Sequence, residues 1–519
     1  MTQHSPKVQK LLTLNDPLET SVLEESAYTE FAESDVSDLL ALAGDVELLA
    51  LPTPAEGANE STVDRRVWGP AHALRTLGAI GAVKAIPEIV ALLEKHESAL
   101  LLGAATDACE AMGEAAIEPL TKVLSETKNP GVVLVAADAV AAIGADDWKH
   151  RDRAIEALRT GMNRAKDLSP EANAYLVTSA LDLEALELTE IIEAMFKDGF
   201  VDVLTIEEET ALAQLGRTAD GPLRLSFKCT ECGRADSRVV PHVYPHPDPA
   251  KCAREGWDGL VLGRVIHCYG CGAIDEYELD AAAKQLLMMG AARVMGGQSQ
   301  PHRILPLEIQ LKSGKTGRRP SEILEDHLNY ANENPDDADA WRDYARACQF
   351  FDQVEDAIEA WDNVGDLDEE AFDAPFSLGM LYAEMEELEE AYEYFDSALS
   401  MLPECKDAPK GERSRALRII AQTMAQLNDM LEEPQAICMN WQIPGDSEGA
   451  QVIDVAEIEN WEPIGEFLES GMVTEIALAP MTDATDPTPL ANAIETWKKR
   501  KKNPFAGRGF HGTSRKRRR

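Results

Sequence analysis

The chain has 519 residues, of which 45% are hydrophobic, and its formal net charge is −43. This length predicts three or four domains, and the lack of any apolar run of about 18 residues predicts no transmembrane helix. The polar N-terminus, residues 1–16, lacks the apolar core of a signal peptide. Nine cysteines, four of them in metal-binding spacing, are typical of a reducing compartment, so we expect a cytoplasmic protein.

The charge is unevenly spread along the chain. Residues 498–519 contain eleven Lys or Arg and no Asp or Glu, which leaves −54 on the remainder. An acidic body repels nucleic acid and keeps a large helical surface soluble. The basic end has the opposite polarity and needs its own explanation.

The N-terminal half predicts helices. Residues 1–62 read as an irregular helical segment, with an apolar stripe over 34–51 followed by a linker. Residues 63–200 repeat a pattern in which Gly78, Gly113 and Gly144 recur at intervals of 35 and 31 residues. Each unit predicts a helix ended by glycine, a turn and a second helix. The pattern resembles the HEAT-like repeats of bacterial proteins, including the short form known from phycobilin lyases, and the resemblance implies stacked helix pairs with a concave binding surface.

Residues 221–281 contain the most specific motif. Cys229 and Cys232, then Cys268 and Cys271, form two Cys-x-x-Cys pairs, each followed by glycine. Two thiolates three residues apart can reach one metal from a tight turn, and two such pairs make a tetrahedral four-thiolate set. With apolar alternation in the flanking segments, the pattern predicts a zinc ribbon holding one structural Zn²⁺ ion.

The long gap between the two pairs leaves other ligand sets open. The segment 242–259 contains His242, His246 and Cys252. Any of these could replace a cysteine ligand or line an open coordination position, whereas the simpler interpretation is a solvated loop beside a closed site. A redox-active pair of thiols is a further alternative, although no thioredoxin-like pattern surrounds the motif.

The next segments predict a joint and a second helical array. Residues 282–319 read as a helix and a linker; the sequence Ser-Gly-Lys-Thr at 313–316 lacks the upstream glycine of a phosphate loop. In 320–430 the period becomes 34 residues, and the spacing of Gly379, Ala391 and Phe395 resembles a tetratricopeptide repeat with flanking helices. The segment is dominated by Asp and Glu, so a basic peptide is the expected ligand unless these carboxylates form only a solvated face.

The C-terminal part predicts a small α+β module over 431–497 and a disordered basic tail over 498–519. The tail could bind RNA phosphates by charge, or it could lie on the acidic body of its own chain. It faintly resembles the SEC-C motif of bacterial repeat proteins, but it has no cysteine, so no metal is implied. The predicted contact residues are Lys498, Lys499, Arg500, Lys501, Lys502, Arg515, Lys516, Arg517, Arg518 and Arg519.

Taken together, the sequence predicts a mainly α protein with two helical-repeat arrays, an inserted zinc-ribbon β module and a small α+β module. The expected function is that of a non-enzymatic scaffold or adaptor for protein partners, with no membrane association. An RNA- or ribosome-associated factor that uses the ribbon and the tail is the alternative. A lyase-like enzyme, with His242, His246, Cys252 and the zinc as its reactive centre, is a third hypothesis.

Overall fold

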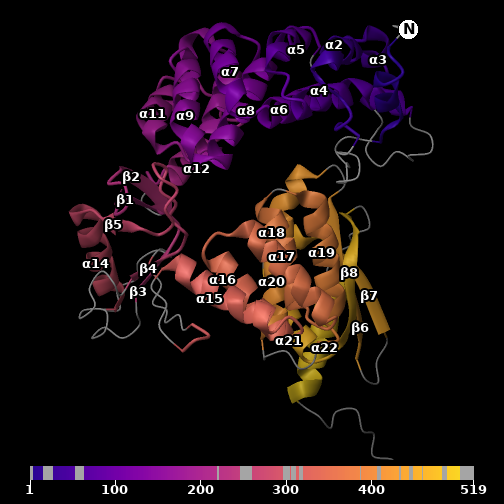
Figure 1. Ribbon diagram of the computed structural model, residues 1–519. Helices are drawn as coiled ribbons and strands as arrows, with labels where there is room; N and C mark the ends of the chain where they lie inside the picture. The colour runs from indigo at the N-terminus through magenta and orange to yellow at the C-terminus, as the bar shows by residue number, and fades with distance from the viewer. Residues whose placement is uncertain are drawn as a thin grey trace, which may run out of the picture. The chain divides into compact units, whose positions relative to one another are not determined.

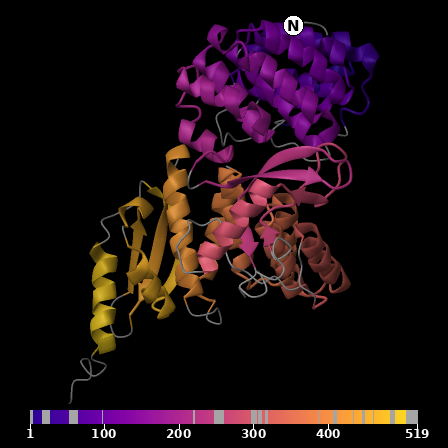
Figure 2. The same cartoon turned by 90° about the vertical axis from the view of Figure 1, so that its left-hand side faces the viewer.

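The structure is a computed structural model of the chain (Figures 1 and 2). It describes residues 4–15, 27–52, 64–96, 98–218, 221–245, 260–295, 304, 311–314, 319–385, 387–405, 411–431, 434–443, 448–458, 460–481 and 488–502. These residues are mainly helical with small antiparallel sheets, which confirms the predicted fold class. Within them, no helix has the length and apolar content that a membrane crossing requires.

The chain forms two compact units, which we describe separately. The first unit contains residues Met1–Glu308 and Arg318–Ser321, and the second contains Ile309–Gly317 and Glu322–Arg519. The helices of the first unit are η1 Val8–Thr13, η3 Glu33–Asp35, α2 Val36–Ala43, α3 Val46–Leu49, η5 Arg65–Trp68, α4 Gly69–Ala79, η6 Val83–Ala85, α5 Ile86–Leu93, α6 Ala99–Ala111, α7 Glu114–Glu126, α8 Pro130–Asp146, α9 Trp148–Met162, η7 Ala165–Asp167, α10 Pro170–Asp182, η8 Leu186–Leu188, α11 Thr189–Lys197, α12 Glu208–Gln214 and α14 Ala281–Met295.

The helices α4–α11, which we call the first array, pack in two rows (Figure 1). One row stacks α4, α6, α8 and α10 in order, and the other places α5 against α7 and α7 against α9. Small residues make this close stacking possible: Ala105, Ala108, Ala136 and Ala137 are completely buried. The array therefore has the helical-repeat architecture that the alanine-rich pattern predicts.

The recurring glycines do not all have the predicted role. Gly113 follows α6 with φ +62°, as a helix-ending glycine does. In contrast, Gly78 and Gly144 lie inside α4 and α8. A Cβ atom at Gly78 would lie 2.6 Å from the Cα atom of Ala108, and one at Gly144 would lie 2.5 Å from a side chain of α9. The prediction that these two glycines end helices is wrong, because they are required for close helix contacts instead.

A small β module follows the array. Its strands are β1 Leu223–Cys229, β2 Ala235–Val240, β3 Val243–Pro245, β4 Leu260–Leu262 and β5 Tyr277–Leu279. The antiparallel sheet has the order β2-β1-β5, and β3 pairs with β4 in a second antiparallel ladder. Alternate residues of β1 are buried, including Leu225 and Phe227, and they pack with Leu287 of α14. This alternation places the first cysteine at the buried end of the central strand.

The second unit combines a helical array with a sheet. Its helices are α15 Pro320–Glu333, α16 Ala338–Phe350, α17 Val354–Leu367, α18 Asp373–Glu384, α19 Leu388–Met401, α20 Glu412–Leu427, η10 Asn428–Met430, η11 Val455–Glu457, α21 Glu462–Glu469 and α22 Thr488–Lys502. The strands β6 Gln435–Gln442, β7 Glu448–Ile453 and β8 Val473–Pro480 form an antiparallel sheet in the order β7-β6-β8 (Figure 2).

Two features of this unit follow the sequence closely. The buried Ala357 and Ala391 let paired helices approach, and the ring of Phe395 occupies the space where a Cβ atom of Gly379 would lie. The sheet shares its core with α19, α20 and α21. The predicted disordered tail over 498–519 is wrong for its first residues, because helix α22 runs from Thr488 to Lys502 and so includes Lys498–Lys502.

Candidate metal centre

The two cysteine pairs lie in two backbone turns of the same kind. The Gly233 N–H donates to the Cys229 carbonyl at 3.0 Å, and the Gly272 N–H donates to the Cys268 carbonyl at 2.8 Å. In both turns the N–H of the first cysteine donates to the carbonyl five residues later, at 2.8 Å. The two glycines have φ angles of +77° and +74°, a conformation that other residues adopt only with strain. The sequence Cys-x-x-Cys-Gly thus specifies one turn, which this chain uses twice.

The two turns bring four sulfur atoms together. The Sγ atoms of Cys229 and Cys271 are 3.7 Å apart, and those of Cys232 and Cys268 are 3.5 Å apart. All four Sγ atoms lie within 4.8 Å of one another, in a group that could hold a metal ion. The pairing of β5 with β1 brings the second turn back to the first, since the Thr230 N–H donates to the Glu276 carbonyl at 3.0 Å.

The four thiols differ in acidity. Burial raises the pKa of Cys229, but backbone N–H groups of its own turn outweigh this effect and bring the pKa to about 7. Burial also raises the pKa of Cys268. For Cys271, a backbone N–H lowers the pKa, but burial and the other three sulfurs together raise it to about 12. The group gives up one proton readily and the last with difficulty, so a cation would be needed to ionise all four thiols at neutral pH.

The structure describes only one of the three alternative ligands. His242 is described and does not belong to the four-cysteine group; its ring stacks on Tyr244, with centroids 6.3 Å apart. His246 and Cys252 lie outside the described residues.

The predicted contact residues of the basic end are placed only in part. The Lys498 ammonium group lies 3.8 Å from a Glu466 carboxylate oxygen, and Lys499–Lys502 belong to α22. Arg515–Arg519 lie outside the described residues.

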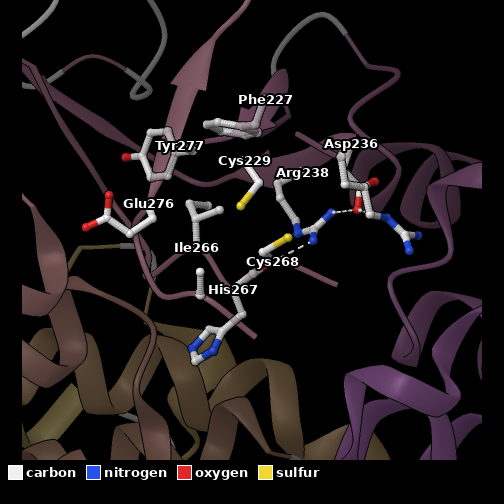
Figure 3. A pocket seen from close by; sticks show the side chains of 11 residues that line it. Phe227, Cys229, Asp236, Arg238, Ile266, His267, Cys268, Glu276 and Tyr277 are labelled. Atoms are coloured by element: carbon white, nitrogen blue, oxygen red, sulfur yellow. Dashed lines mark hydrogen bonds and ion pairs between the residues drawn. The ribbon is translucent and has the colours of Figure 1, made fainter. Parts of the chain in front are cut away.

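A small cavity adjoins the cysteine group (Figure 3). Its volume is about 20 Å³, and Phe227, Ile266 and Tyr277 contribute its apolar wall. The rings of Phe227 and Tyr277 meet edge to face with centroids 4.9 Å apart. A cavity of this volume holds about one water molecule and is far smaller than a small-molecule site.

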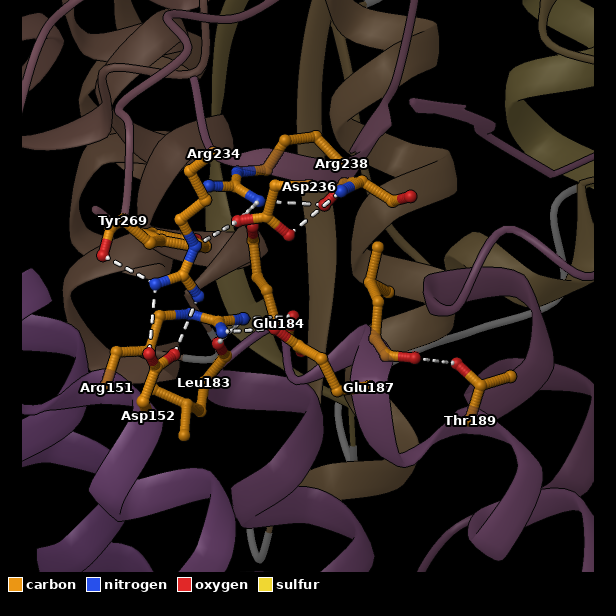
Figure 4. A network of polar contacts seen from close by, with 12 residues as sticks. Arg151, Asp152, Leu183, Glu184, Glu187, Thr189, Arg234, Asp236, Arg238 and Tyr269 are labelled. Atoms are coloured by element: carbon orange, nitrogen blue, oxygen red, sulfur yellow. Dashed lines mark hydrogen bonds and ion pairs between the residues drawn. The ribbon is translucent and has the colours of Figure 1, made fainter. Parts of the chain in front are cut away.

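The second turn also contacts the first array through Tyr269 (Figure 4). Its ring lies between two guanidinium groups: Arg151 of α9 is 3.9 Å from the ring centroid, and Arg238 of β2 is 3.4 Å from it. Arg151 is 2% exposed and donates to the Glu187 carboxylate at 2.9 Å and to the Glu184 carbonyl at 2.7 Å. Desolvated cation–π contacts contribute about 2 kcal/mol each. Tyr269, the residue after Cys268, therefore fixes the β module to the helices.

Further contacts surround this stack. Arg234, two residues after Cys232, donates to both carboxylate oxygens of Asp152 at 2.7 and 2.9 Å and to the Tyr269 carbonyl at 3.2 Å. A Cβ atom at Gly272 would lie 2.7 Å from the indole nitrogen of Trp148, the first residue of α9. Bidentate guanidinium–carboxylate pairs fix orientation as well as distance. The cysteine group and the N-terminal half of α9 therefore form one continuous structure.

Sequence reasoning identified the cysteines but not the contacts that dock them. Arg151, Asp152 and Tyr269 carry no motif, and Arg151 and Tyr269 are 118 positions apart in the chain. The only available indication was that two cationic residues, Arg234 and Arg238, closely follow the first cysteine pair in a very acidic protein.

No known family model matches this sequence, and no curated protein is significantly similar to it. The arrangement of its residues therefore carries the functional argument.

Proposed function

We propose that the protein is a non-enzymatic scaffold that binds other proteins through its helical arrays and uses a structural zinc ribbon to fix one end of the first array. The observation that carries this proposal is the double use of the second turn. Cys268 and Cys271 belong to the sulfur group, while Tyr269 and Gly272 between and beside them contact α9. A metal held there stabilises a surface rather than exposing a reactive position.

The sulfur group is compatible with zinc. A tetrahedral Zn²⁺ ion with Zn–S bonds of 2.3 Å requires sulfur atoms about 3.8 Å apart. The Sγ–Sγ separations of 3.5 and 3.7 Å, within a group no wider than 4.8 Å, are close to this value. Four thiolates also complete the coordination of zinc. Cys229, Cys232, Cys268 and Cys271 would hold the ion, which would supply the positive charge that keeps all four ionised.

The binding surface that we infer is a set of carboxylates on the stacked helices α6, α8 and α10. Burial, then the charges of Asp107 and Asp146, raise the pKa of Glu110. Burial raises the pKa of Asp138 to about 6, and the charge of Asp182 adds to this effect. Carboxylates that repel one another across neighbouring helices destabilise the free protein. A partner segment carrying Lys or Arg would relieve that repulsion.

The charge of Asp138 gives opposite expectations for stability and for binding. Because its folded pKa of about 6 lies above the usual value of 3.8, ionisation destabilises the fold above pH 6, and stability rises as pH falls from 6 to 4. Asp138→Asn should therefore raise the free energy of unfolding at pH 7 by roughly 2 kcal/mol and remove that pH dependence. If the carboxylates bind a basic segment, the same variant should bind it less tightly.

The test is capture of partners from lysate on the full-length protein, with and without RNase. We expect protein partners that survive RNase, are reduced by Glu110→Lys and Asp138→Asn, and are unaffected by Asp198→Asn, which changes an exposed carboxylate after α11. Thermal unfolding of each variant at pH 5 and pH 7.5 separates a binding defect from a folding defect. Turnover of a metabolite that a single substitution abolishes would overturn the scaffold proposal.

The RNA-associated alternative rests on the helical extension of the basic end. Lys498–Lys502 continue α22, so a dense run of positive charge begins on an ordered helix. RNA binding through this end should weaken steeply with salt and disappear when the chain is truncated after Thr496. The lyase-like hypothesis makes a different prediction, namely that Cys252→Ala removes an activity while leaving zinc bound.

A further inference from the structure

A cleft of about 760 Å³ lies in the second unit between α20, α21 and α22. Arg415 and Arg418 line it from α20, Glu462 and Glu466 from α21, Trp497 from α22, and Trp461 from the position just before α21. This volume is within the range of sites that hold a small molecule or a few peptide side chains. The cleft belongs neither to the cysteine group nor to the first array.

The two arginines of the cleft are exceptional in their unit. Lys312, Arg342, Arg346, Arg413 and Lys498 are all ion-paired there. Among the described side chains of the unit, Arg415 and Arg418 are the remaining cations, and their guanidinium groups make no ion pair or hydrogen bond. Both are exposed and, three residues apart, lie on one side of α20. In a protein of net charge −43, two adjacent cations without carboxylate partners indicate a site for an external anion.

Two of the three carboxylates that line the cleft have other partners. Glu469 accepts from Arg413 at 3.1 Å and from the Ser414 N–H at 3.2 Å. Glu466 lies 3.8 Å from the Lys498 ammonium group. Neither carboxylate is paired with Arg415 or Arg418, so both guanidinium groups are available to a ligand.

The tryptophans give the cleft an apolar wall. Trp461 is 6% exposed and directly precedes α21, so its ring is held firmly by the core. Trp497 is only partly buried, and its ring meets Phe467 edge to face with centroids 5.7 Å apart. A ligand that places an apolar group here and an anionic group at the arginines would use both features.

We propose that this cleft binds a short peptide segment of a partner protein that presents a carboxylate beside an aromatic or large aliphatic side chain. The proposal rests on the proposed scaffold function, because the ligand is part of a protein. It adds a second recognition surface whose preference is acidic, the opposite of that of the first array. A nucleic acid fits less well, because its continuous phosphate charge would pass Glu462 and Glu466 on the opposite side of the cleft.

The test uses the full-length protein and an array of eight-residue peptides. Peptides with a central Glu-Phe, Asp-Trp or Glu-Leu pair are compared with matched peptides in which Gln or Lys replaces the acidic residue. Affinities of the best peptides are then measured by fluorescence anisotropy. We expect binding that needs the acidic residue and weakens about tenfold or more in Arg415→Gln/Arg418→Gln. Lys197→Gln, at an exposed cation of the first unit, should not change it.

Several controls make the outcome decisive. The basic tail is intact in every variant, so its non-specific attraction cancels in the comparison. Unchanged thermal unfolding of the double variant is expected, because both arginines are exposed.

Two results would overturn the proposal: acidic peptides that bind the double variant as tightly as the unchanged protein, or an unchanged protein that shows no preference for acidic peptides. Oligouridine binding that depends on both arginines would also overturn it by showing a nucleic-acid site. If peptide binding at the cleft fails these tests while the protein still captures partners from lysate, the proposed scaffold function stands.

Discussion

The two cysteine turns are alike in backbone and unlike in surroundings. Both have the same hydrogen bonds and a glycine with nearly the same φ angle. Around Gly233, a Cβ atom would meet only the flexible end of Lys228 at 4.0 Å, whereas around Gly272 it would meet the ring of Trp148 at 2.7 Å. Thr230 is exposed in the first turn, while Tyr269, at the same position in the second, lies between two arginines.

This difference separates two functions within one motif. The features that the turns share are those that a four-sulfur group needs, namely the spacing of the cysteines and the angle of the glycine. The features that differ are those that fix the β module to α9. Matched substitutions at equivalent positions of the two turns can therefore measure docking separately from metal binding.

Removal of the metal should have the largest effect on the stability of the β module. The effect should be the same whichever turn loses its cysteine. Structural zinc contributes on the order of 10 kcal/mol to such modules, so Cys229→Ser and Cys268→Ser should each lose zinc and unfold the β module. Zinc content and protease sensitivity of the segment 221–295 measure this. A β module that stays protected and docked in either variant would contradict the proposed zinc site.

Alanine substitutions at Gly233 and Gly272 should reveal the different surroundings of the two turns directly. Ala at either glycine introduces a strained φ angle, which costs about 1 kcal/mol. Gly272→Ala also forces a contact with the Trp148 ring, which should add roughly 1–3 kcal/mol, whereas Gly233→Ala adds none. Competition with a chelator should therefore show weaker zinc retention for Gly272→Ala. Equal loss in the two variants would mean that α9 does not constrain the second turn.

The residues after the first cysteines should give the smallest but most specific contrast. Tyr269→Ala removes a ring from between Arg151 and Arg238, so it should cost about 1–3 kcal/mol and increase hydrogen exchange in α9. Thr230→Ala, at the exposed equivalent position, should cost less than about 0.5 kcal/mol. Tyr269→Phe keeps the ring and serves as the control. Zinc content should remain the same in all three variants, since none changes a ligand.

Much of the local structure could be predicted from the sequence, because it depends on residues close together in the chain. The cysteine and glycine spacing predicted the two turns, and alternation of apolar residues predicted β1. Strand β7 could not be predicted in this way, because its residues show little alternation. Gly449 faces Trp441 in the ladder, and a Cβ atom there would lie 2.4 Å from that indole ring. Only the neighbouring strand explains why this glycine belongs to a sheet.

The sequence by itself determined the mainly helical class, the repeating helices and the identity of the four clustered cysteines, since each depends on a pattern of short range. Only the tertiary structure decided that Gly78 and Gly144 serve helix contacts, that Tyr269 docks the β module and that Arg415 and Arg418 stay unpaired. In each case the deciding atoms come from segments far apart in the chain. Packing and charge balance in space, not spacing along the sequence, determine which of them meet.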